Sequence, residues 1–289
     1  MKQWIGRRKV MKRAAALMLA CLLCLSLFAC SRTEPEPPEE EDDPPAGPVA
    51  PQPDPQPDPD PDPAVTVEER SLSKTYTNDA GDELLRVSAV VPCPAGSDAM
   101  EQIAAYYEAW LDDIEYYCET MLVETAAEGL AWAKESESVF NPYAFESAYQ
   151  VTRSDAAVFS VMRDQYESTG GVHPAYTMLA ETFDASNGGR LSVFTLFSSM
   201  EQQEVLTFIR GKVLPIAKRK LEAQPDLYYE NYEELLMDAF DPLCFAMTDT
   251  GLTLYWQTYA IGPYVSGVQR FDISYEELDG VMDAQWMPS

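Results

Sequence analysis

The sequence predicts an α+β fold in which an antiparallel sheet packs against a long N-terminal helix and one or two further helices. Three observations favour this class. Residues 97–134 place apolar side chains at helical spacing, and several later runs alternate polar and apolar residues with a period of two. The connections between those runs are short, and strands joined by tight turns run antiparallel. We therefore expect a sheet made of hairpins.

The folded part is expected to open with a hairpin followed by the long helix. Residues 65–77 and 84–91 are rich in β-forming residues, and the NDAGDE sequence between them is typical of a turn. Ser97 can cap the first amides of the helix, which we expect to end or bend near Gly129. Its apolar stripe is interpreted as a core seam, with a sugar-stacking platform as the alternative. The stripe consists of Ile103, Tyr107, Trp110, Ile114, Tyr117 and Met121.

Strands predominate after the long helix. Runs 145–153, 156–168 and 175–186 alternate in polarity, and SNGG at 186–189 predicts a turn because Asn and Gly tolerate positive φ angles. A second helix is expected after Ser198, which has capping-box spacing to Glu201. Its predicted buried face comprises Val205, Phe208, Ile209, Val213 and Ile216, and a third helix (230–240) and strands at 243–248, 252–258 and 267–273 complete the chain.

The N-terminus predicts export and lipid attachment. Six basic residues within 1–13 precede an apolar run that stops at LFAC, so residues 1–29 are typical of a bacterial lipoprotein signal peptide, with Met1 or Met11 as the start. We expect Cys30 to become the first mature residue and to carry diacylglyceryl on its sulfur. The alternative is an uncleaved anchor. The expected location is the extracytoplasmic face of the cell membrane of a Gram-positive bacterium.

A stalk is predicted between this anchor and the folded part. Residues 31–64 contain 13 prolines and 11 acidic residues against a single base, so they cannot form an apolar core. Proline at this density favours extended polyproline II. We interpret residues 30–64 as a lipidated spacer, and a proline-rich recognition motif is the alternative.

Composition restricts the partners and the chemistry of residues 65–289. This part carries 37 acidic and 13 basic residues, a net charge of −24, which repels nucleic acid and attracts cationic partners. Its three cysteines, Cys93, Cys118 and Cys244, allow at most one disulfide, and three buried inert thiols are an equal alternative. No CxxC pair lies in this part, which argues against a redox or zinc site.

The only histidine, His173, lies in STGGVHPAY. No second histidine and no GxSxG motif accompany it, so a structural histidine bonded to neighbouring backbone is favoured over ligand contact, and both are favoured over catalysis or metal binding. The segment YWQTYAIGPY (255–264) places Tyr259 and Tyr264 beside a Gly-Pro bend. Tyrosines at a bend suit a binding surface, although core packing is the favoured interpretation.

No motif predicts an enzyme or a cofactor. Asp249-Thr250-Gly251 spells half of an aspartic-protease pair, but it is expected to be a turn because that mechanism needs two such loops. Asp184, Ser186 and Gly188 loosely match a calcium loop without its closing glutamate, and a hairpin turn is favoured. Carboxylate pairs are unavoidable among so many acids, so a hydrolase stays a minor alternative.

Several motifs together resemble a known family. STGGVHPAYTMLAETFD, GGRLSVFTLF, LTLYWQTYAIGPYVSG and ISYEEL are similar to the extracellular domain of RsiV-like anti-sigma factors, which is also an N-terminal module of some peptidoglycan deacetylases. The resemblance divides the folded part into a companion region (65–165) and a signature region (166–280). It implies an α+β module that, in the anti-sigma member, binds lysozyme.

The resemblance does not extend to the effector parts of those proteins. Only 13 residues precede the apolar segment and no deacetylase domain follows, so we expect the sensor module alone. The expected protein is a non-enzymatic surface lipoprotein that binds lysozyme or another cationic protein, without a cofactor. A cell-wall glycan-binding module is the first alternative. Ligand-binding residues are expected to be His173, Tyr259 and Tyr264.

Overall fold

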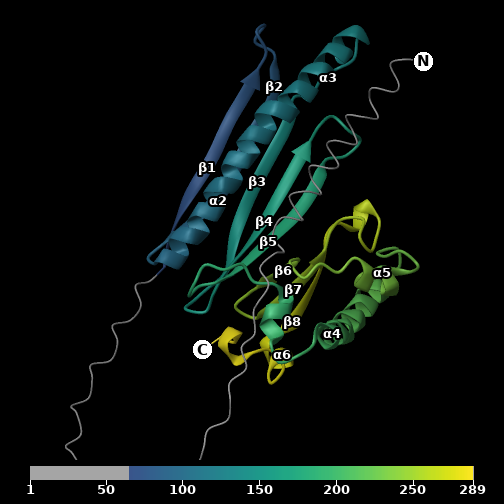
Figure 1. Ribbon diagram of the computed structural model, residues 1–289. Helices are drawn as coiled ribbons and strands as arrows, with labels where there is room; N and C mark the ends of the chain where they lie inside the picture. Colours follow the sequence, from purple (N-terminus) through teal and green to yellow (C-terminus); the bar gives the residue numbers. More distant parts are fainter. Residues whose placement is uncertain (1–64, 289) are drawn as a thin grey trace, which may run out of the picture. The chain divides into compact units, whose positions relative to one another are not determined.

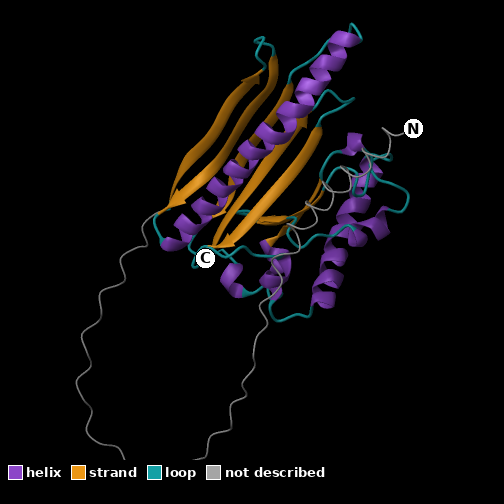
Figure 2. Ribbon diagram, turned by 45° about the horizontal axis from the view of Figure 1, so that its top comes forward, coloured by secondary structure: helices purple, strands orange, loops and turns teal. Residues whose placement is uncertain are grey.

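The structure, a computed structural model, describes residues 65–288 and confirms the α+β class. The predicted signal peptide, the lipid site at Cys30 and the stalk lie outside the described residues. Two sheets are present instead of the single sheet expected: a five-stranded sheet and a three-stranded sheet, each with its own helices (Figures 1 and 2). No helix within residues 65–288 combines the length and the apolar character needed to cross a bilayer.

The five-stranded sheet has the strand order β1-β2-β3-β4-β5 and is mixed rather than wholly antiparallel. Three of its pairs are antiparallel, but β2 and β3 run parallel, with Leu85 opposite Tyr143. The purely antiparallel sheet was therefore a wrong prediction. A helical crossover separates these two strands and returns the chain to the end where β2 began. The strands are β1 (Thr66–Thr77), β2 (Glu83–Ala95), β3 (Tyr143–Ser154), β4 (Val158–Ser168) and β5 (Ala175–Asp184).

The crossover is a helical segment that covers one face of this sheet (Figure 1). It is not one continuous α-helix, because α2 (Asp98–Tyr117) and α3 (Val123–Glu135) are joined by a π-helical segment, η1 (Cys118–Leu122). Ser97 caps α2 as expected, accepting a hydrogen bond from the Met100 amide at 3.3 Å. The segment passes Gly129 without ending there.

The π-helical segment changes which residues face the sheet. Ile103 and Tyr107 are buried as expected, but Met121, the last residue of the predicted stripe, is 51% exposed. Cys118 and Leu122 are buried in its place. A π turn contains more than 3.6 residues, so it rotates the following apolar face relative to the preceding one.

The second layer contains the three-stranded sheet and the largest apolar core. Its strands are β6 (Phe245–Met247), β7 (Gly251–Trp256) and β8 (Gln269–Ser274), all antiparallel neighbours. Val205, Ile209 and Val213 of the next long helix are buried as predicted. The helical elements are η2 (Val193–Phe197), α4 (Gln202–Ala223), α5 (Tyr232–Asp238), η3 (Tyr264–Ser266), α6 (Tyr275–Leu278) and η4 (Ala284–Trp286).

Two local predictions in this layer have different outcomes. The capping box of α4 begins at Glu201, whose partner is Glu204, so the predicted cap at Ser198 was three residues too early. The Asp249-Thr250-Gly251 turn is confirmed, since the Thr248 amide bonds the Gly251 carbonyl at 2.8 Å. A Cβ atom at Gly251 would lie 2.1 Å from the Ile273 carbonyl oxygen, so the close approach of β8 requires glycine there.

The small sheet packs against β5 of the large sheet. Met178 and Ala180 of β5 are buried against Ala246 and Tyr255 of the small sheet. Strand β4 runs through residues 165 and 166, where the companion and signature regions of the sequence meet. Because the small sheet packs against β5, the loop after β7 lies close to the β4–β5 connection. These two loops form the candidate site.

Candidate functional site

The three residues singled out in the sequence lie together at one exposed corner, although His173 is 86 residues before Tyr259 in the chain. The His173 ring stacks on the Tyr264 ring with centroids 3.8 Å apart and an interplanar angle of 20°. The Tyr259 hydroxyl lies 3.2 Å from His173 Nε2. We call these three residues, with the exposed Val172 and Val265 beside them in sequence, the aromatic corner.

The β4–β5 loop presents His173. The loop starts after Ser168, and the register that pairs Glu167 with Ala175 fixes its two ends. Gly170 has φ +74°, a left-handed conformation that glycine adopts without steric cost. Pro174 restricts the backbone of His173 to extended conformations and ends the loop at β5. The loop is therefore specified by its Gly and Pro residues rather than by core packing.

The loop between β7 and β8 presents the two tyrosines and is fastened to β5. The Gln257 side chain donates to the Met178 carbonyl at 2.5 Å and accepts from the Met178 amide at 3.3 Å. The Tyr264 hydroxyl donates to the Pro174 carbonyl at 2.9 Å. These bonds join the two loops through backbone groups, so the corner is formed before any ligand arrives.

A close backbone contact with the segment after α4 also supports the loop between β7 and β8. A Cβ atom at Gly262 would lie 2.4 Å from the Leu227 carbonyl oxygen, so only glycine fits between the loop and the segment after α4. Ser266 Oγ donates to that carbonyl at 2.6 Å, and the Tyr229 amide donates to the Ile261 carbonyl at 3.0 Å. The Gly-Pro bend is thus a packing requirement that holds the tyrosines outward.

Tyr259 has a strained backbone. Its φ angle is +69°, which costs a non-glycine residue roughly 1–3 kcal/mol, and its side chain is 53% exposed. Core packing was the favoured interpretation of the two tyrosines and is wrong: Tyr259 is exposed and Tyr264 is only partly covered. Burial does not repay the strain at Tyr259, and unlike Glu137, the other exposed non-glycine residue with positive φ within residues 65–288, it belongs to an aromatic cluster.

The predicted backbone contact of His173 is present, together with side-chain contacts that the sequence did not predict. Its Nδ1 atom lies 3.2 Å from the Pro174 carbonyl oxygen. A carbonyl oxygen can only accept, so Nδ1 carries the proton, and in the neutral ring Nε2 accepts from the Tyr259 hydroxyl. His173 is nevertheless solvent-exposed, so it orients both tyrosines while one edge of the cluster stays open to a ligand.

The corner lies at the end of the sheet where α3 ends. Tyr143, the first residue of β3, lies between them: Cβ atoms at Gly170 and Gly129 would lie 3.6 and 3.1 Å from its side chain. The helical segment 98–135 carries ten acidic residues and one lysine. By contrast, five of the 13 bases of the folded part lie in α4: Arg210, Lys212, Lys218, Arg219 and Lys220. The charge of the domain is therefore strongly uneven.

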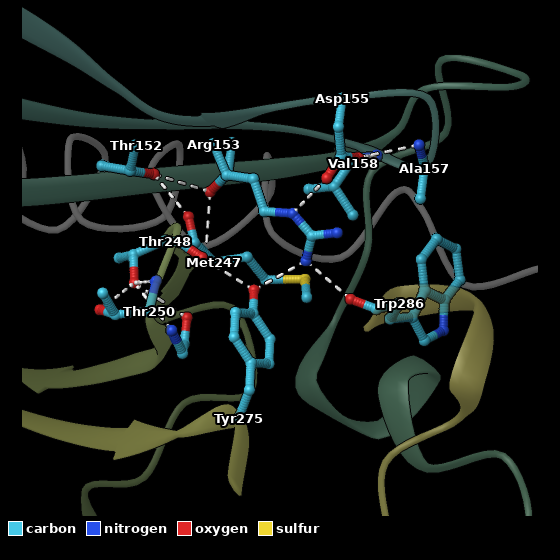
Figure 3. A network of polar contacts seen from close by, with 12 residues as sticks. Thr152, Arg153, Asp155, Ala157, Val158, Met247, Thr248, Thr250, Tyr275 and Trp286 are labelled. Carbon is cyan, nitrogen blue, oxygen red and sulfur yellow. Dashed lines mark hydrogen bonds and ion pairs between the residues drawn. The ribbon is translucent and has the colours of Figure 1, made fainter. Parts of the chain in front are cut away.

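A network around Arg153 anchors the small sheet on the large one (Figure 3). The buried guanidinium donates from Nη1 to the Tyr275 hydroxyl at 2.7 Å and to the Trp286 carbonyl at 2.6 Å, and from Nε to Asp155 at 2.6 Å. The Tyr275 hydroxyl in turn donates to the Thr248 carbonyl at 2.8 Å. Arg153 Nη2 is buried without a partner within the described residues, but Nε and Nη1 are both bound to protein groups, so we assign the network to stability.

A polar hollow between the two sheets offers a weaker candidate. It has a volume of about 370 Å³ and is lined by Gln150, Thr152, Asp249, Arg270 and Asp272 among others. Two of its charged groups already have partners, since Thr253 Oγ1 donates to Asp272 at 2.6 Å and Arg270 lies 3.8 Å from Asp164. Within residues 65–288 no cluster of three or more His, Cys, Asp or Glu side chains is placed to hold a metal ion.

The remaining sequence candidates have structural roles. Asp184 accepts from the Ser186 amide at 2.8 Å and from Asn187 Nδ2 at 2.7 Å, which confirms the hairpin turn. Cys93, Cys118 and Cys244 are all free thiols. Burial raises the pKa of Cys118 to about 12 and that of Cys244 to about 11, so both stay protonated at neutral pH.

Sequence reasoning missed the residues that flank and fasten the corner. Val172 and Val265 are fully or largely exposed, but a single valine beside a turn carries no signal of exposure. Gln257 clamps β5 through two hydrogen bonds, and nothing in its sequence context marks it. Val265 lies within the IGPY-x-x-G pattern, which is the one clue that could have drawn attention to it.

Comparisons with known proteins support the fold and locate the best-matched region. Residues 197–276, which include Tyr259 and Tyr264, match the model of a family described as a protein of unknown function, DUF3298. No curated protein matches the chain. The match to the family model covers the small sheet, α4 and α5, and it stops short of His173.

Two crystal structures of DUF3298 family proteins share the fold. One, from Bacteroides fragilis, is 17% identical with a TM-score of 0.59, and the superposition covers 77% of this chain and 95% of that one. The other, from Pseudomonas aeruginosa PAO1, is 16% identical with a TM-score of 0.51 and covers 79% and 99%. At these identities the likeness establishes an architecture common to all three chains and leaves the ligand open.

Proposed function

We propose that this chain is a non-enzymatic lipoprotein of the bacterial cell surface whose folded domain binds a cationic extracellular protein at the aromatic corner. Lysozyme is the sharpest candidate ligand. One observation carries the proposal: an exposed aromatic cluster, fastened by hydrogen bonds to backbone groups, includes a tyrosine with a strained backbone that contributes nothing to the core.

The charge of the domain supports a basic ligand. A net charge of −24 over residues 65–289 attracts cationic proteins over about a Debye length, roughly 8 Å at physiological ionic strength. The acidic helical segment ends at the same end of the sheet as the aromatic corner. Long-range attraction and a rigid aromatic contact are separate contributions, the first to the rate of association and the second to the lifetime of the complex.

Lipid attachment at Cys30 is the second part of the proposal. The support is the sequence alone: a basic start, an apolar run and LFAC before the cysteine. Mass spectrometry of the chain purified from membranes should find residue 30 as the first residue, with diacylglycerol and palmitate on it. Replacing Cys30 with serine should release the protein into the medium, whereas an unmodified sulfur at this position would refute the anchor.

Substitutions at the corner test the binding function. Tyr259→Ala and Val265→Lys should each weaken lysozyme binding at least about tenfold, because a tyrosine that anchors an interface contributes about 1.4 kcal/mol or more and the new lysine repels a cationic ligand. Tyr116→Ala is the matched control, because Tyr116 is a 70% exposed tyrosine on α2 whose side chain makes no hydrogen bond within the described residues. Equal losses in all three variants, or no loss at the corner, would contradict the proposal.

A cell-wall glycan is the alternative ligand, and the exposure of the Tyr259 ring supports it. Exposed tyrosine rings such as Tyr259 stack on sugar faces, and this contact does not depend on net charge. Glycan binding would then be nearly independent of salt, whereas binding of a basic protein would weaken steeply as salt rises. Titration with soluble peptidoglycan fragments at low and high salt separates the two ligands.

A further inference from the structure

Strand β1 presents an open backbone edge. It is twelve residues long, pairs only with β2, and forms one edge of the five-stranded sheet (Figure 1). In a paired strand every second residue directs its N–H and C=O groups away from the neighbour, so the outer side of β1 carries a row of free donors and acceptors. Within residues 65–288, no hydrogen bond reaches that row.

The opposite edge of the same sheet, β5, is partly covered. On β5 the Met178 amide and carbonyl are bonded by Gln257, and the Ala180 carbonyl accepts from Arg190 at 3.2 Å. Further along, the Thr182 carbonyl accepts from the Leu191 amide at 2.7 Å and the Asp184 amide donates to the Gly189 carbonyl at 2.9 Å. The protein binds several outward backbone groups of β5 and none of those on β1 within residues 65–288.

β1 lacks two of the usual features that prevent edge pairing, although it does carry charged residues. It contains no proline, its only register irregularity is at its end between Tyr76 and Thr77, and it is longer than a typical edge strand. Its charged residues are Glu68, Glu69, Arg70 and Lys74. Both signs are present, so the pattern can be attractive or repulsive depending on the register with a partner strand.

The charge pattern is complementary to itself in one register. When two copies of β1 pair antiparallel about a two-fold axis, one residue lies opposite its own copy. If the strands overlap along nearly their full length, that central residue is Ser71 or Leu72. Centring on Leu72 would oppose Arg70 with Lys74. Centring on Ser71 opposes Glu68 with Lys74 twice, and no like charges face each other directly. Glu68 is exposed and makes no ion pair within the described residues, whereas Lys74 already pairs with Glu115 and Glu119 of the helical segment, so Glu68 of the second copy would join an existing contact.

We propose that β1 is a self-association edge: two copies of this chain pair β1 with β1 in antiparallel orientation, centred on Ser71, and join their sheets into one. The edge is distant in sequence from the aromatic corner and does not depend on the proposed ligand. The large negative charge of each copy opposes this association, so the dimer strengthens as salt rises. A complex with a basic protein responds to salt in the opposite direction.

Disulfide trapping in the whole chain, in detergent solution, tests both the edge and the register. Residues directly opposite each other in an antiparallel pair have Cα atoms about 4.5–5.5 Å apart, within disulfide range. Ser71→Cys should therefore give a covalent dimer on mild oxidation, at least about tenfold above the unchanged chain. Ser73→Cys is the matched control: it opposes Glu69, so its two copies lie about 13 Å apart along the strands and should not crosslink.

A charge reversal provides a second test that leaves the core untouched. Glu68→Lys places like charges opposite each other at two symmetry-related positions and should weaken dimerisation about tenfold in sedimentation equilibrium. Glu124→Lys makes the same change in net charge on α3, away from the edge, and should not weaken it. Three results would each overturn the proposal: no crosslinking in the Ser71→Cys variant, crosslinking in the Ser73→Cys variant instead, or equal effects of the two lysine variants.

Discussion

Asp155 shows how a single carboxylate holds the β3–β4 turn and Arg153 together. Its Oδ1 accepts from the amides of Ala157 and Val158 at 2.9 Å, and its Oδ2 accepts from Arg153 Nε at 2.6 Å. Partial burial raises the pKa of Asp155, but the hydrogen bonds from Arg153 and the two amides outweigh it and hold that pKa below its ordinary value. The folded state therefore favours the charged carboxylate.

This depressed pKa predicts an acid sensitivity with a definite sign. The contribution of Asp155 to stability is complete above the unfolded-state pKa of about 4 and disappears as pH falls through the lower folded-state value. Asp155→Asn should lower the urea midpoint at pH 7, and the difference from the unchanged protein should shrink towards pH 3. Asp112→Asn, at an exposed position on α2, is the control. A difference as large at pH 3 as at pH 7 would refute this account.

The residues of the aromatic corner were predictable only in part. His173 is the single histidine, and Tyr259 and Tyr264 lie beside a Gly-Pro bend, so rarity and turn chemistry drew attention to all three. The sequence could not show that residues 86 positions apart come into contact, because that depends on how the β7–β8 loop packs against β5. It also gave the wrong burial for Tyr259, since exposure is decided by neighbours far along the chain.

At the scale of elements, the π-helical segment η1 decides which side of α3 faces the sheet. Leu122 is 4% exposed and packs in the core cluster beneath the helix, whereas the adjacent Met121 is 51% exposed. A continuous α-helix from Ser97 places Met121 on the buried stripe, which is what the sequence periodicity suggested. The extra residue in the π turn is invisible to a pattern analysis that assumes a constant period.

Neighbouring alanine substitutions test this change of face. Leu122→Ala should lower the free energy of unfolding by about 2–5 kcal/mol, because it removes a buried side chain and leaves a cavity. Met121→Ala should change it by less than about 0.5 kcal/mol, because the side chain is on the surface. Chemical denaturation of both variants measures the two values. The reverse order would mean that α2 and α3 form one regular helix.

A buried ion pair lies between α2 and the sheet. Arg163 of β4 donates to Glu181 of β5 at 2.5 and 3.1 Å, and both side chains are at most 3% exposed. The Trp110 ring of α2 covers the guanidinium, with its centroid 4.0 Å from Cζ. Desolvation makes such a pair costly to form, but removing one partner leaves a buried charge without compensation.

The pair should therefore respond differently to single and double substitution. Glu181→Gln is expected to destabilise the fold by about 3–5 kcal/mol, because Arg163 stays buried with a neutral partner. The double variant Arg163→Met with Glu181→Leu should recover most of that loss. Urea unfolding of both proteins measures the difference. A double variant as unstable as the single one would show that the pair itself stabilises the sheet.

Local elements were more predictable than their assembly. The hairpins of β1–β2 and β3–β4–β5 follow from turn residues and alternating polarity, and the structure contains all of them. The parallel pairing of β2 with β3 could not be predicted, because 47 residues separate the two strands and no local signal fixes their register. The division into two sheets likewise depends on tertiary packing and has no local signal in the sequence.

At the scale of the whole molecule, the most unevenly charged helices are separate from the hydrogen-bonded junction that holds the aromatic corner. The helical segment 98–135 carries ten acidic residues and one base, five bases lie on α4, and the aromatic corner lies at the junction of the two layers. The Arg153 network and the Gln257 clamp keep that junction fixed. In the proposed function, a fixed corner would lose little conformational freedom on binding, and the uneven charge would orient a basic partner during approach.

Titration of lysozyme into the whole chain at low and at physiological salt tests the central claim most directly. The account predicts saturable binding at low salt, a dissociation constant that rises at least about tenfold at physiological salt, and a further increase of at least about tenfold in Val265→Lys at both. Binding unaffected by Val265→Lys, or no saturable binding at low salt, would contradict the assignment of the aromatic corner as a surface for a cationic protein.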